Sequence, residues 1–343
     1  MNDSNEQKLF EELRSLLVVN TLSKHEQIIN GVINAIKQKA VLAGGKLPSV
    51  NQMSAELGFA KETVVKAYKE LINRGIIESR NRRGFFVNNT DTDQQLKVFL
   101  LLYAFDTFQE TFYQSFKNEL GAHVHIDVFF HHNNFSVFEA IINSNKGKYG
   151  MYVIAPIQTK EAKRILDQLP TNKLLLVDRY LKLSNDHSYV VQEFEKSSYK
   201  AFEALAPRIK EFSEFVFFFK PSSAEPDDVY RSFKKFIKDF DIRGKVQNKY
   251  KKNSIVAGKV YFTIHNLELW EILKDAKLNG LIPGKDIGIL SHNDDDIKEI
   301  IFDGITTFSI DFASMGKIAA NYVLTLKPIK HTMETHLIRR NSL

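Results

Sequence analysis

Positively charged side chains gather in one stretch of this 343-residue chain. Residues 20–90 contain eleven Lys or Arg residues against five Glu residues, which accounts for the whole formal excess of +6. Arg80, Arg82 and Arg83 stand in a single glycine-containing turn of this stretch. A basic segment joined to an otherwise neutral chain indicates a polyanionic partner for that segment, and arginines at a turn suit the phosphates of a nucleic acid.

Residue patterns that would support catalysis or metal binding are missing from the sequence. The chain has no Cys, which excludes disulfides, thiolate nucleophiles and Cys-ligated zinc. No acidic residue at matching spacing accompanies His123, His125, His131 and His132, so we expect ordinary strand histidines. Asp294–Asp296 lacks EF-hand spacing and is expected to be a solvated loop. With no phosphate-binding glycine loop and no GxSxG elbow, we predict no enzyme, no cofactor and no metal site.

The elements that must position the basic residues are three short helices and a hairpin. The spacing of apolar residues places them at residues 24–39, 48–57, 61–74 and 76–87. Pro48 and Ser49 give the start signal of the second helix, and Gly75 gives the end of the third. This order predicts a winged helix-turn-helix, whose third helix fits the major groove of DNA. The alternative is a three-helix scaffold that binds another protein.

The same residues resemble the signature of GntR-type regulators. Residues 46–58, KLPSVNQMSAELG, are similar to the family pattern kLPSeReLAeelGv, and residues 63–78 and 80–87 are similar to its recognition-helix and wing patterns. Asn51, Val65 and Arg82 depart from the residues that the family usually carries. The resemblance implies a DNA-binding set that comprises Ser49, Asn51, Gln52, Lys61, Glu62, Thr63, Lys66, Arg80, Arg82, Arg83 and Gly84.

The rest of the chain has a different pattern. A polar segment, residues 91–95, is predicted to link a DNA-binding domain at residues 1–90, with an N-terminal extension at 1–20, to a second domain at residues 96–343. There, strands and amphipathic helices alternate in two series, which predicts two α/β lobes with a cleft between them. No apolar run is long enough to span a membrane and no signal peptide is evident, so we expect a soluble cytoplasmic protein.

The second domain resembles the effector-binding domain of LacI/GalR regulators, a type I periplasmic-binding-protein-like fold. Residues 279–294 are similar to the family pattern G…vP.disvvGyDd, residues 304–312 to pLTTi.qdf, and residues 174–179 to PvVliDR. A GntR head on such a body is the arrangement of arabinose-repressor-type regulators. The resemblance implies that a small sugar-like effector is bound by Asp178, Arg231, His265 and Asn293, with Phe108 or Phe112 stacking on it.

Together these features predict a ligand-responsive transcription factor, expected to repress genes of carbohydrate metabolism. Two winged helices in a homodimer would bind a pseudo-palindromic operator in double-stranded DNA. A monosaccharide or derivative in the cleft would rotate the lobes and change that binding. The alternatives are the same regulator with a nucleobase or polyol effector, and a constitutive DNA-binding protein whose body binds no ligand.

Overall fold

The chain divides into two compact units. The computed structural model describes residues 3–16, 23–81, 83–88, 96–121, 124–221 and 225–343. One unit contains Met1–Leu100, Gly121–Val128 and Ile141–Tyr152, and the other contains Leu101–Leu120, Phe129–Ala140 and Val153–Leu343. The linker predicted at residues 91–95 lies outside the described residues, so the domain boundaries stay a prediction.

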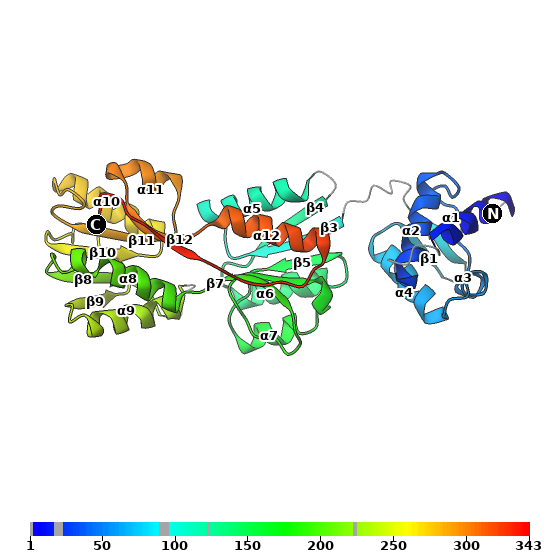
Figure 1. Ribbon diagram of the computed structural model, residues 1–343, viewed down its shortest axis with the longest axis horizontal. Helices are drawn as coiled ribbons and strands as arrows, with labels where there is room; N and C mark the ends of the chain where they lie inside the picture. Colours follow the sequence, from blue (N-terminus) through cyan, green and yellow to red (C-terminus); the bar gives the residue numbers. More distant parts are fainter. Residues whose placement is uncertain (1–2, 17–22, 82, 89–95, 122–123, 222–224) are drawn as a thin grey trace. The chain divides into compact units, whose positions relative to one another are not determined.

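The described N-terminal residues form four helices and a hairpin (Figure 1). The elements are α1 (Asp3–Leu16), α2 (Lys24–Lys37), α3 (Val50–Leu57), α4 (Lys61–Asn73), β1 (Ile77–Arg80) and β2 (Gly84–Val87). Capping boxes begin two of the helices, with Ser23 and Glu26 at α2 and Ser49 and Gln52 at α3. Gly58, with φ 68°, ends α3 in the left-handed conformation and lets the chain turn at once into α4.

One apolar core holds these helices together. Its buried members include Ile28, Val32, Ile36, Met53, Val64, Leu71, Ile77 and Val87. Helix α1, which the sequence analysis left without structure, adds Leu9, Phe10 and Leu13 to this core. A Cβ at Gly31 would lie 2.4 Å from Leu13 Cδ2 and 3.1 Å from Leu13 Cα, so glycine permits the close approach of α1 and α2. Residues 3–16 of the predicted extension are therefore part of the folded N-terminal module.

The wing is an antiparallel pair of short strands. Its register runs from Ile77 opposite Val87 to Arg80 opposite Gly84. A bridge between Lys46 and Phe86 attaches the hairpin to the loop before α3. The predicted winged helix-turn-helix is confirmed.

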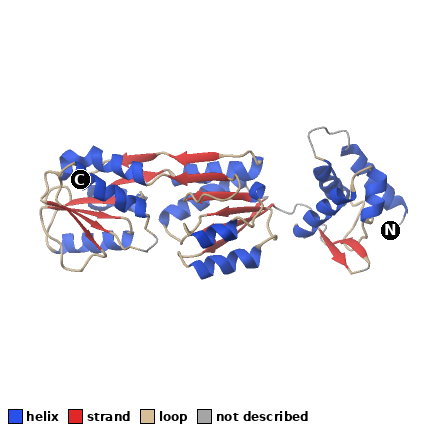
Figure 2. Ribbon diagram, turned by 90° about the horizontal axis from the view of Figure 1, so that it is seen from below, coloured by secondary structure: helices blue, strands red, loops and turns tan. Residues whose placement is uncertain are grey.

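The second domain contains two six-stranded sheets with helices on both faces (Figure 2). The first sheet has the order β13-β7-β6-β5-β3-β4. Its strands are β3 (Leu96–Leu102), β4 (Val124–Phe130), β5 (Met151–Ile154), β6 (Leu174–Asp178), β7 (Ser188–Gln192) and β13 (Lys330–Met333). Figure 1 shows one pair of helices on each face: α5 (Thr107–Leu120) with α12 (Phe312–Thr325), and α6 (Phe135–Asn145) with α7 (Lys160–Leu166).

The second sheet repeats the topology of the first, with the order β14-β12-β11-β10-β8-β9. Its strands are β8 (Glu214–Phe218), β9 (Gly244–Gln247), β10 (Lys259–Thr263), β11 (Gly288–His292), β12 (Thr306–Ile310) and β14 (Thr335–Ile338). The described pairings within it are parallel, except that β14 runs antiparallel to β12. The associated helices are α8 (Glu195–Ile209), α9 (Asp227–Asp239), α10 (Asn266–Leu278) and α11 (Asp296–Ile300). The predicted fold of two α/β lobes is confirmed.

Alternating apolar residues explain why this second sheet is covered on both faces. Phe215 and Phe217 of β8 pack in one core with residues of α8 and α9, whereas Val216 and Phe218 pack in another with residues of α10. Successive strand side chains point to opposite faces, so a continuous apolar run requires a helical layer on each side.

The chain passes between the two sheets at three short segments. It leaves β7 for α8 through residues 193–194, and it leaves β12 for α12 through Asp311. Strands β13 and β14 belong to different sheets and are separated by Glu334 alone. These segments bring residues that are distant in the sequence to the same edge of the two sheets.

Candidate DNA-binding face and ligand pocket

Helix α4 presents a charged face to solvent. Its exposed side chains surround a shallow depression lined by Lys61, Glu62, Val65, Lys66 and Lys69. Val64 and Tyr68 on the opposite side are buried, and Tyr68 donates a 2.7 Å hydrogen bond to the Pro48 carbonyl. Burial raises the pKa of Tyr68, so its hydroxyl stays protonated as the donor. The buried side thus fixes α4 in place while its basic side remains accessible.

The residues predicted at the start of α3 also have a structural role. Ser49 Oγ accepts a hydrogen bond from Gln52 N at 3.2 Å, and Gln52 Oε1 accepts one from Ser49 N at 2.9 Å. The side chain of Asn51 is exposed beside this box, whereas Thr63 on α4 is half-buried. The structure therefore assigns Ser49 and the carbonyl group of Gln52 to helix capping.

The wing contributes a second group of basic side chains. Arg80 Nη2 lies 2.7 Å from Glu78 Oε1, and its guanidinium carbon lies 4.4 Å from the centre of the Phe86 ring. Arg83 is exposed at the turn, and Gly84 has φ 104°, which favours glycine. Arg82 lies outside the described residues. The salt bridge with Glu78 and the contact with the Phe86 ring therefore orient the side chain of Arg80.

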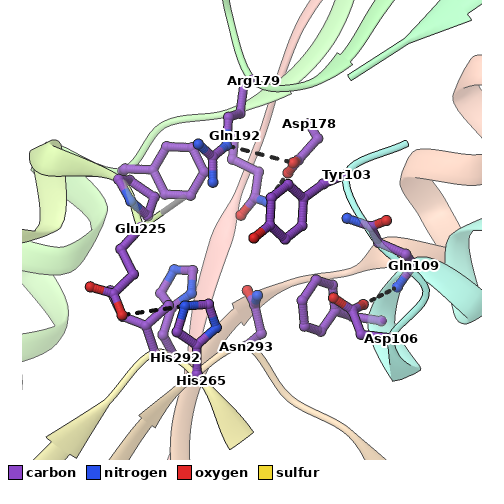
Figure 3. Close-up of a pocket in the computed structure, with 14 residues that line it drawn as sticks. Tyr103, Asp106, Gln109, Asp178, Arg179, Gln192, Glu225, His265, His292 and Asn293 are labelled. Atoms are coloured by element: carbon purple, nitrogen blue, oxygen red, sulfur yellow. Dashed lines mark hydrogen bonds and ion pairs between the residues drawn. The ribbon is translucent and has the colours of Figure 1, made fainter. Parts of the chain in front are cut away.

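A pocket lies where strands of both sheets end, and all of its lining residues belong to the second compact unit. Its volume, counted to its open mouth, is about 520 Å³. Figure 3 shows Tyr103, Gln192 and Asn293 pointing toward the same space. The complete lining comprises Tyr103, Asp106, Phe108, Gln109, Asp178, Arg179, Gln192, Phe194, Glu225, Pro226, Ile264, His265, His292 and Asn293.

Asp178 is held at the end of β6 by two neighbours. Its Oδ1 accepts a hydrogen bond from Gln192 Nε2, and its Oδ2 lies 3.9 Å from Arg179 Nε. Burial raises the pKa of Asp178, while the nearby Arg179 and Gln192 act in the opposite direction. Its φ of 66° is unusual for a residue with a side chain. Such backbone strain occurs preferentially at functional sites.

Asn293 follows β11 and has no hydrogen-bond partner for its side-chain oxygen. The residue is 6% exposed, with φ 60°, and its Oδ1 is buried without a partner among the described residues. The preceding His292 is also buried, and its Nδ1 has no hydrogen-bond partner among the described residues. Burial lowers the pKa of His292 to about 3, so this imidazole is neutral at pH 7. Unpaired buried polar atoms are costly, which is the pattern expected of a site that a ligand completes.

Two further carboxyl groups face the pocket. Glu225 Oε1 lies 3.3 Å from Nε2 of His265, the residue that precedes α10. Asp106 Oδ1 accepts a 3.0 Å hydrogen bond from the Gln109 N–H in the first turn of α5. Burial raises the pKa of Asp106 to about 7, whereas burial lowers the pKa of His265. Both shifts favour the neutral form of the group, as desolvation predicts.

A buried lysine supports the loop that carries Asn293. Lys298 Nζ donates hydrogen bonds to the backbone carbonyls of His292 and Asn293 at 3.2 and 2.8 Å. It lies 3.9 Å from Asp295 Oδ2, and both side chains are almost fully buried. Burial lowers the pKa of Lys298 to about 8. Lys298 therefore fixes the backbone at the end of β11 from behind the pocket.

The structure brings together Asp178, His265, Asn293 and Phe108 from the predicted effector set, but not Phe112 or Arg231. Phe112 is 3% exposed and stacks on Phe116, with ring centres 5.7 Å apart. It lies one helical turn beyond Phe108, where α5 is covered by α12 and Gly316 approaches its backbone. The expectation that Phe112 could stack on a ligand is therefore corrected in favour of Phe108.

The structure also corrects the expectation that Arg231 binds the effector. Arg231 projects from α9 with half of its side chain exposed and pairs with Asp228 and with Glu195, the latter at 3.1 Å. Helical periodicity places it on the solvent side of an amphipathic helix whose buried residues include Phe233 and Phe236. Five further lining residues were not predicted from the sequence: Tyr103, Asp106, Gln109, Gln192 and Glu225. Arg179 belongs to the motif at residues 174–179 that resembles LacI/GalR regulators.

The acidic run at residues 294–296 is not a solvated loop. Asp294 forms a two-point ion pair with Arg340, at 2.7 and 2.8 Å, and accepts a hydrogen bond from Thr307. Asp295 caps α11 through the Lys298 N–H, and only Asp296 is exposed. Of the histidines, His125 has a carboxylate neighbour that the sequence analysis overlooked, Asp127 at 2.9 Å. Among the described residues, no group of three or more His, Cys, Asp or Glu side chains is arranged to hold a metal ion.

Comparison with known proteins identifies the N-terminal module. Residues 24–87 match the family model "Bacterial regulatory proteins, gntR family". These residues form a GntR-type helix-turn-helix domain. The GntR-type domain resembles that of the HTH-type transcriptional regulator Rv1152 of Mycobacterium tuberculosis, 36% identical over 66 residues, which are 19% of this chain and 54% of that protein.

A second relative leads to the same assignment. The HTH-type transcriptional repressor YtrA of Bacillus subtilis is 38% identical over 64 residues, which are 19% of this chain and 49% of that protein. The chain spans about half the length of these curated relatives, because the similarity is confined to the GntR-type domain.

The second domain has the fold of LacI regulators and periplasmic binding proteins. A similar solved structure is the periplasmic binding protein/LacI transcriptional regulator from Alkaliphilus metalliredigens QYMF complexed with D-xylulofuranose. The match has a TM-score of 0.58 and 11% identity, and it covers 72% of this chain and 99% of that one. At this identity the comparison establishes the fold. Among the described helices, none is both long and apolar enough to cross a membrane.

Proposed function

We propose that this protein is a ligand-responsive transcriptional regulator and has no enzymatic activity. The observation that carries the proposal is a GntR-type domain with an exposed basic recognition helix, on the same chain as a LacI-like fold with a strained polar pocket. Lys61, Lys66 and Arg83 are suited to phosphates, while Glu62 and Asn51 are suited to base edges. Acting on chromosomal DNA, the protein would work in the cytoplasm.

The proposed effector is a monosaccharide or a close derivative. Hydrogen-bonding groups from both sheets, among them Asp178, Gln192 and Asn293, face one space with Phe108 and Phe194. Carboxylates accept hydrogen bonds from hydroxyl groups, side-chain amides both accept and donate them, and an aromatic ring packs against the C–H face of a sugar. A sugar complex of a protein with the same fold supports this choice. A nucleobase or a polyol would be the alternative effector.

The proposed mechanism couples this pocket to DNA through a homodimer. Two GntR-type domains would bind the half-sites of a pseudo-palindromic operator, and repression would follow from occupancy of that operator. The ligand would favour one orientation of the two lobes and thereby lower DNA affinity. A 100-fold loss requires about 2.7 kcal/mol of differential binding.

The DNA-binding part is tested by selection from a random duplex library with the full chain. We expect an enriched sequence with two-fold symmetry, bound in fluorescence anisotropy with an affinity that falls steeply with salt. Lys66→Ala should weaken binding and reduce the salt dependence, whereas Lys8→Ala, an exposed lysine on α1, should not. Failure to enrich any sequence, or equal effects of the two variants, would refute the proposed role.

A further inference from the structure

The charges around the pocket are unbalanced. Asp106, Asp178 and Glu225 contribute carboxyl groups, and Arg179 contributes the single guanidinium of the described lining. That guanidinium already lies 3.9 Å from Asp178. The two lining imidazoles are kept neutral by burial, and the buried Lys298 ammonium is directed to backbone carbonyls behind the lining. A negatively charged ligand would therefore meet acidic groups with little compensating positive charge.

The helix ends near the pocket differ in whether a carboxylate of the chain occupies them. Exposed N–H groups at a helix N-terminus are a common phosphate-binding device. Asp106 caps the first turn of α5, Asp295 caps α11, and Glu193 accepts three backbone N–H bonds at the start of α8. Helices α9 and α10 begin at the lining residues Pro226 and His265 without a side-chain cap. The exclusion of anions therefore depends on the carboxyl groups of the lining and not on the helix ends.

Neutral hydroxyl groups meet the opposite situation. The buried Oδ1 of Asn293 is an acceptor without a partner among the described residues. Nδ1 of His292 also has no partner there, and it donates or accepts according to the tautomer of the ring. Carboxylates accept hydrogen bonds readily from hydroxyl groups. Phe108 and Phe194 provide apolar surface in the same pocket. A sugar ring carries hydroxyl donors at its edge and C–H groups on its faces, so it can satisfy both kinds of surface.

From this arrangement, and resting on the proposed function, we infer that the pocket takes a free sugar and rejects its phosphate ester and its acid. The groups that set this selectivity are the carboxyls of Asp106 and Glu225, which bear on the ligand's charge, and Asn293, which recognises a hydroxyl. The regulator would thus respond to a sugar before it is phosphorylated or oxidised. The class of reaction that removes its effector is phosphoryl transfer to, or oxidation of, that sugar.

The test is calorimetric titration of the full chain with pentoses, hexoses and deoxyhexoses, each beside its phosphate ester and its uronic or aldonic acid. We expect one or more free sugars to bind, and their charged counterparts to bind at least about 100-fold more weakly. A phosphate or acid that binds as tightly as its parent would overturn the inference and leave the sugar-responsive regulator intact. If no compound of either kind binds or raises the melting temperature, the proposed sugar effector itself fails, and the inference with it.

A charge variant separates selectivity from folding. In the Asp106→Asn, Glu225→Gln double variant, the discrimination against the phosphate ester should fall by about tenfold at pH 8, where Asp106 is ionised, because two repulsive charges are gone. Glu139→Gln removes an exposed carboxylate on α6 outside the lining and is the control. A melting temperature no lower than that of the parent protein and unchanged operator binding show that the double variant folds. Unchanged discrimination in that folded variant would refute the role of the carboxyls.

Discussion

Asp178 and Asn293 occupy matching positions in the two six-stranded sheets. Asp178 ends β6 and Asn293 directly follows β11, and these strands hold the same place in the repeated topology. Both residues adopt left-handed backbone conformations, with φ 66° and 60°. Both side chains line the pocket. The internal repetition therefore supplies one strained polar residue from each sheet to a single site.

Asn293 should be needed for ligand binding but not for folding. Asn293→Gly removes the unpartnered buried oxygen and relieves left-handed strain, so we expect equal or higher stability, by up to about 1 kcal/mol. Ligand affinity, measured by calorimetry with whichever sugar binds the full chain, should fall at least about tenfold. Asn253→Gly is the matched control, since Asn253 has φ 59° but is exposed outside the lining. Loss of affinity in both variants would contradict a specific role for Asn293.

The ion pair between Arg340 and Asp294 should stabilise the second domain. The two side chains are 13% and 20% exposed and meet at two points, and Arg340 also donates to the Ile305 carbonyl at 2.9 Å. Arg340→Ala leaves a partly buried carboxylate without its partner, so we expect a loss of about 2–4 kcal/mol in denaturant unfolding. Lys252→Ala, which removes an exposed pair with Glu271, should cost less than about 1 kcal/mol. Similar losses in the two variants would count against this assignment.

Helix α1 should be required for the stability of the GntR-type domain. Gly31→Ala places a methyl group against Leu13, and we expect a loss of about 1–3 kcal/mol despite the better helix propensity of alanine. Leu13→Ala should cost about 2–4 kcal/mol because Leu13 is 1% exposed. The variant that combines both substitutions should lose less stability than the two single losses added together, because the smaller side chain at position 13 leaves room for the methyl group at position 31. Strict additivity in chemical denaturation would exclude the contact.

The pKa of Asp106 predicts a pH-dependent gain from its amide variant. Because burial raises this pKa from 3.8 to about 7, the folded protein binds an extra proton between these values, and its stability falls as pH rises through them. Asp106→Asn removes this penalty while keeping an acceptor for the Gln109 N–H. Allowing for screening of a half-buried group, we expect a gain of about 1 kcal/mol at pH 8 and little at pH 4. Melting curves at the two values test this, and equal shifts would contradict it.

Local signals were sufficient to predict the N-terminal fold. Pro48, Ser49 and Gly58 are signals that act within a few residues, and they placed the ends of the second predicted helix to within two residues. The helix begins at Val50, with Ser49 as its N-cap, and not at Pro48 as predicted. Helix α1 was not predicted because charged residues surround Leu9 and Leu13 in the sequence. The apolar stripe that these two residues form is recognisable only where it packs against α2. The stability of α1 comes from this packing rather than from its own sequence.

The pocket was predicted only in part, because it is assembled from distant segments. Asp178 and Asn293 could be selected because they stand in motifs that resemble those of LacI/GalR regulators. Asp106 and Glu225 could not, because their burial depends on which loops meet after folding. For Arg231, the decisive contacts are its neighbours Asp228 and Glu195, which hold it on the outer side of α9. Sequence spacing alone does not distinguish that side from the pocket.

The passage of the chain through Glu334 limits the motion by which a ligand could act. One residue spans at most about 3.6 Å of extended chain, so β13 and β14 cannot move apart at this point. The segments at residues 193–194 and at Asp311 impose the same restriction beside it. The two lobes therefore cannot separate at these segments. The motion that remains is a rotation of one lobe relative to the other about the three connecting segments. A bound ligand would therefore act on the rest of the protein by changing the angle between the two lobes, and not by changing the distance between them.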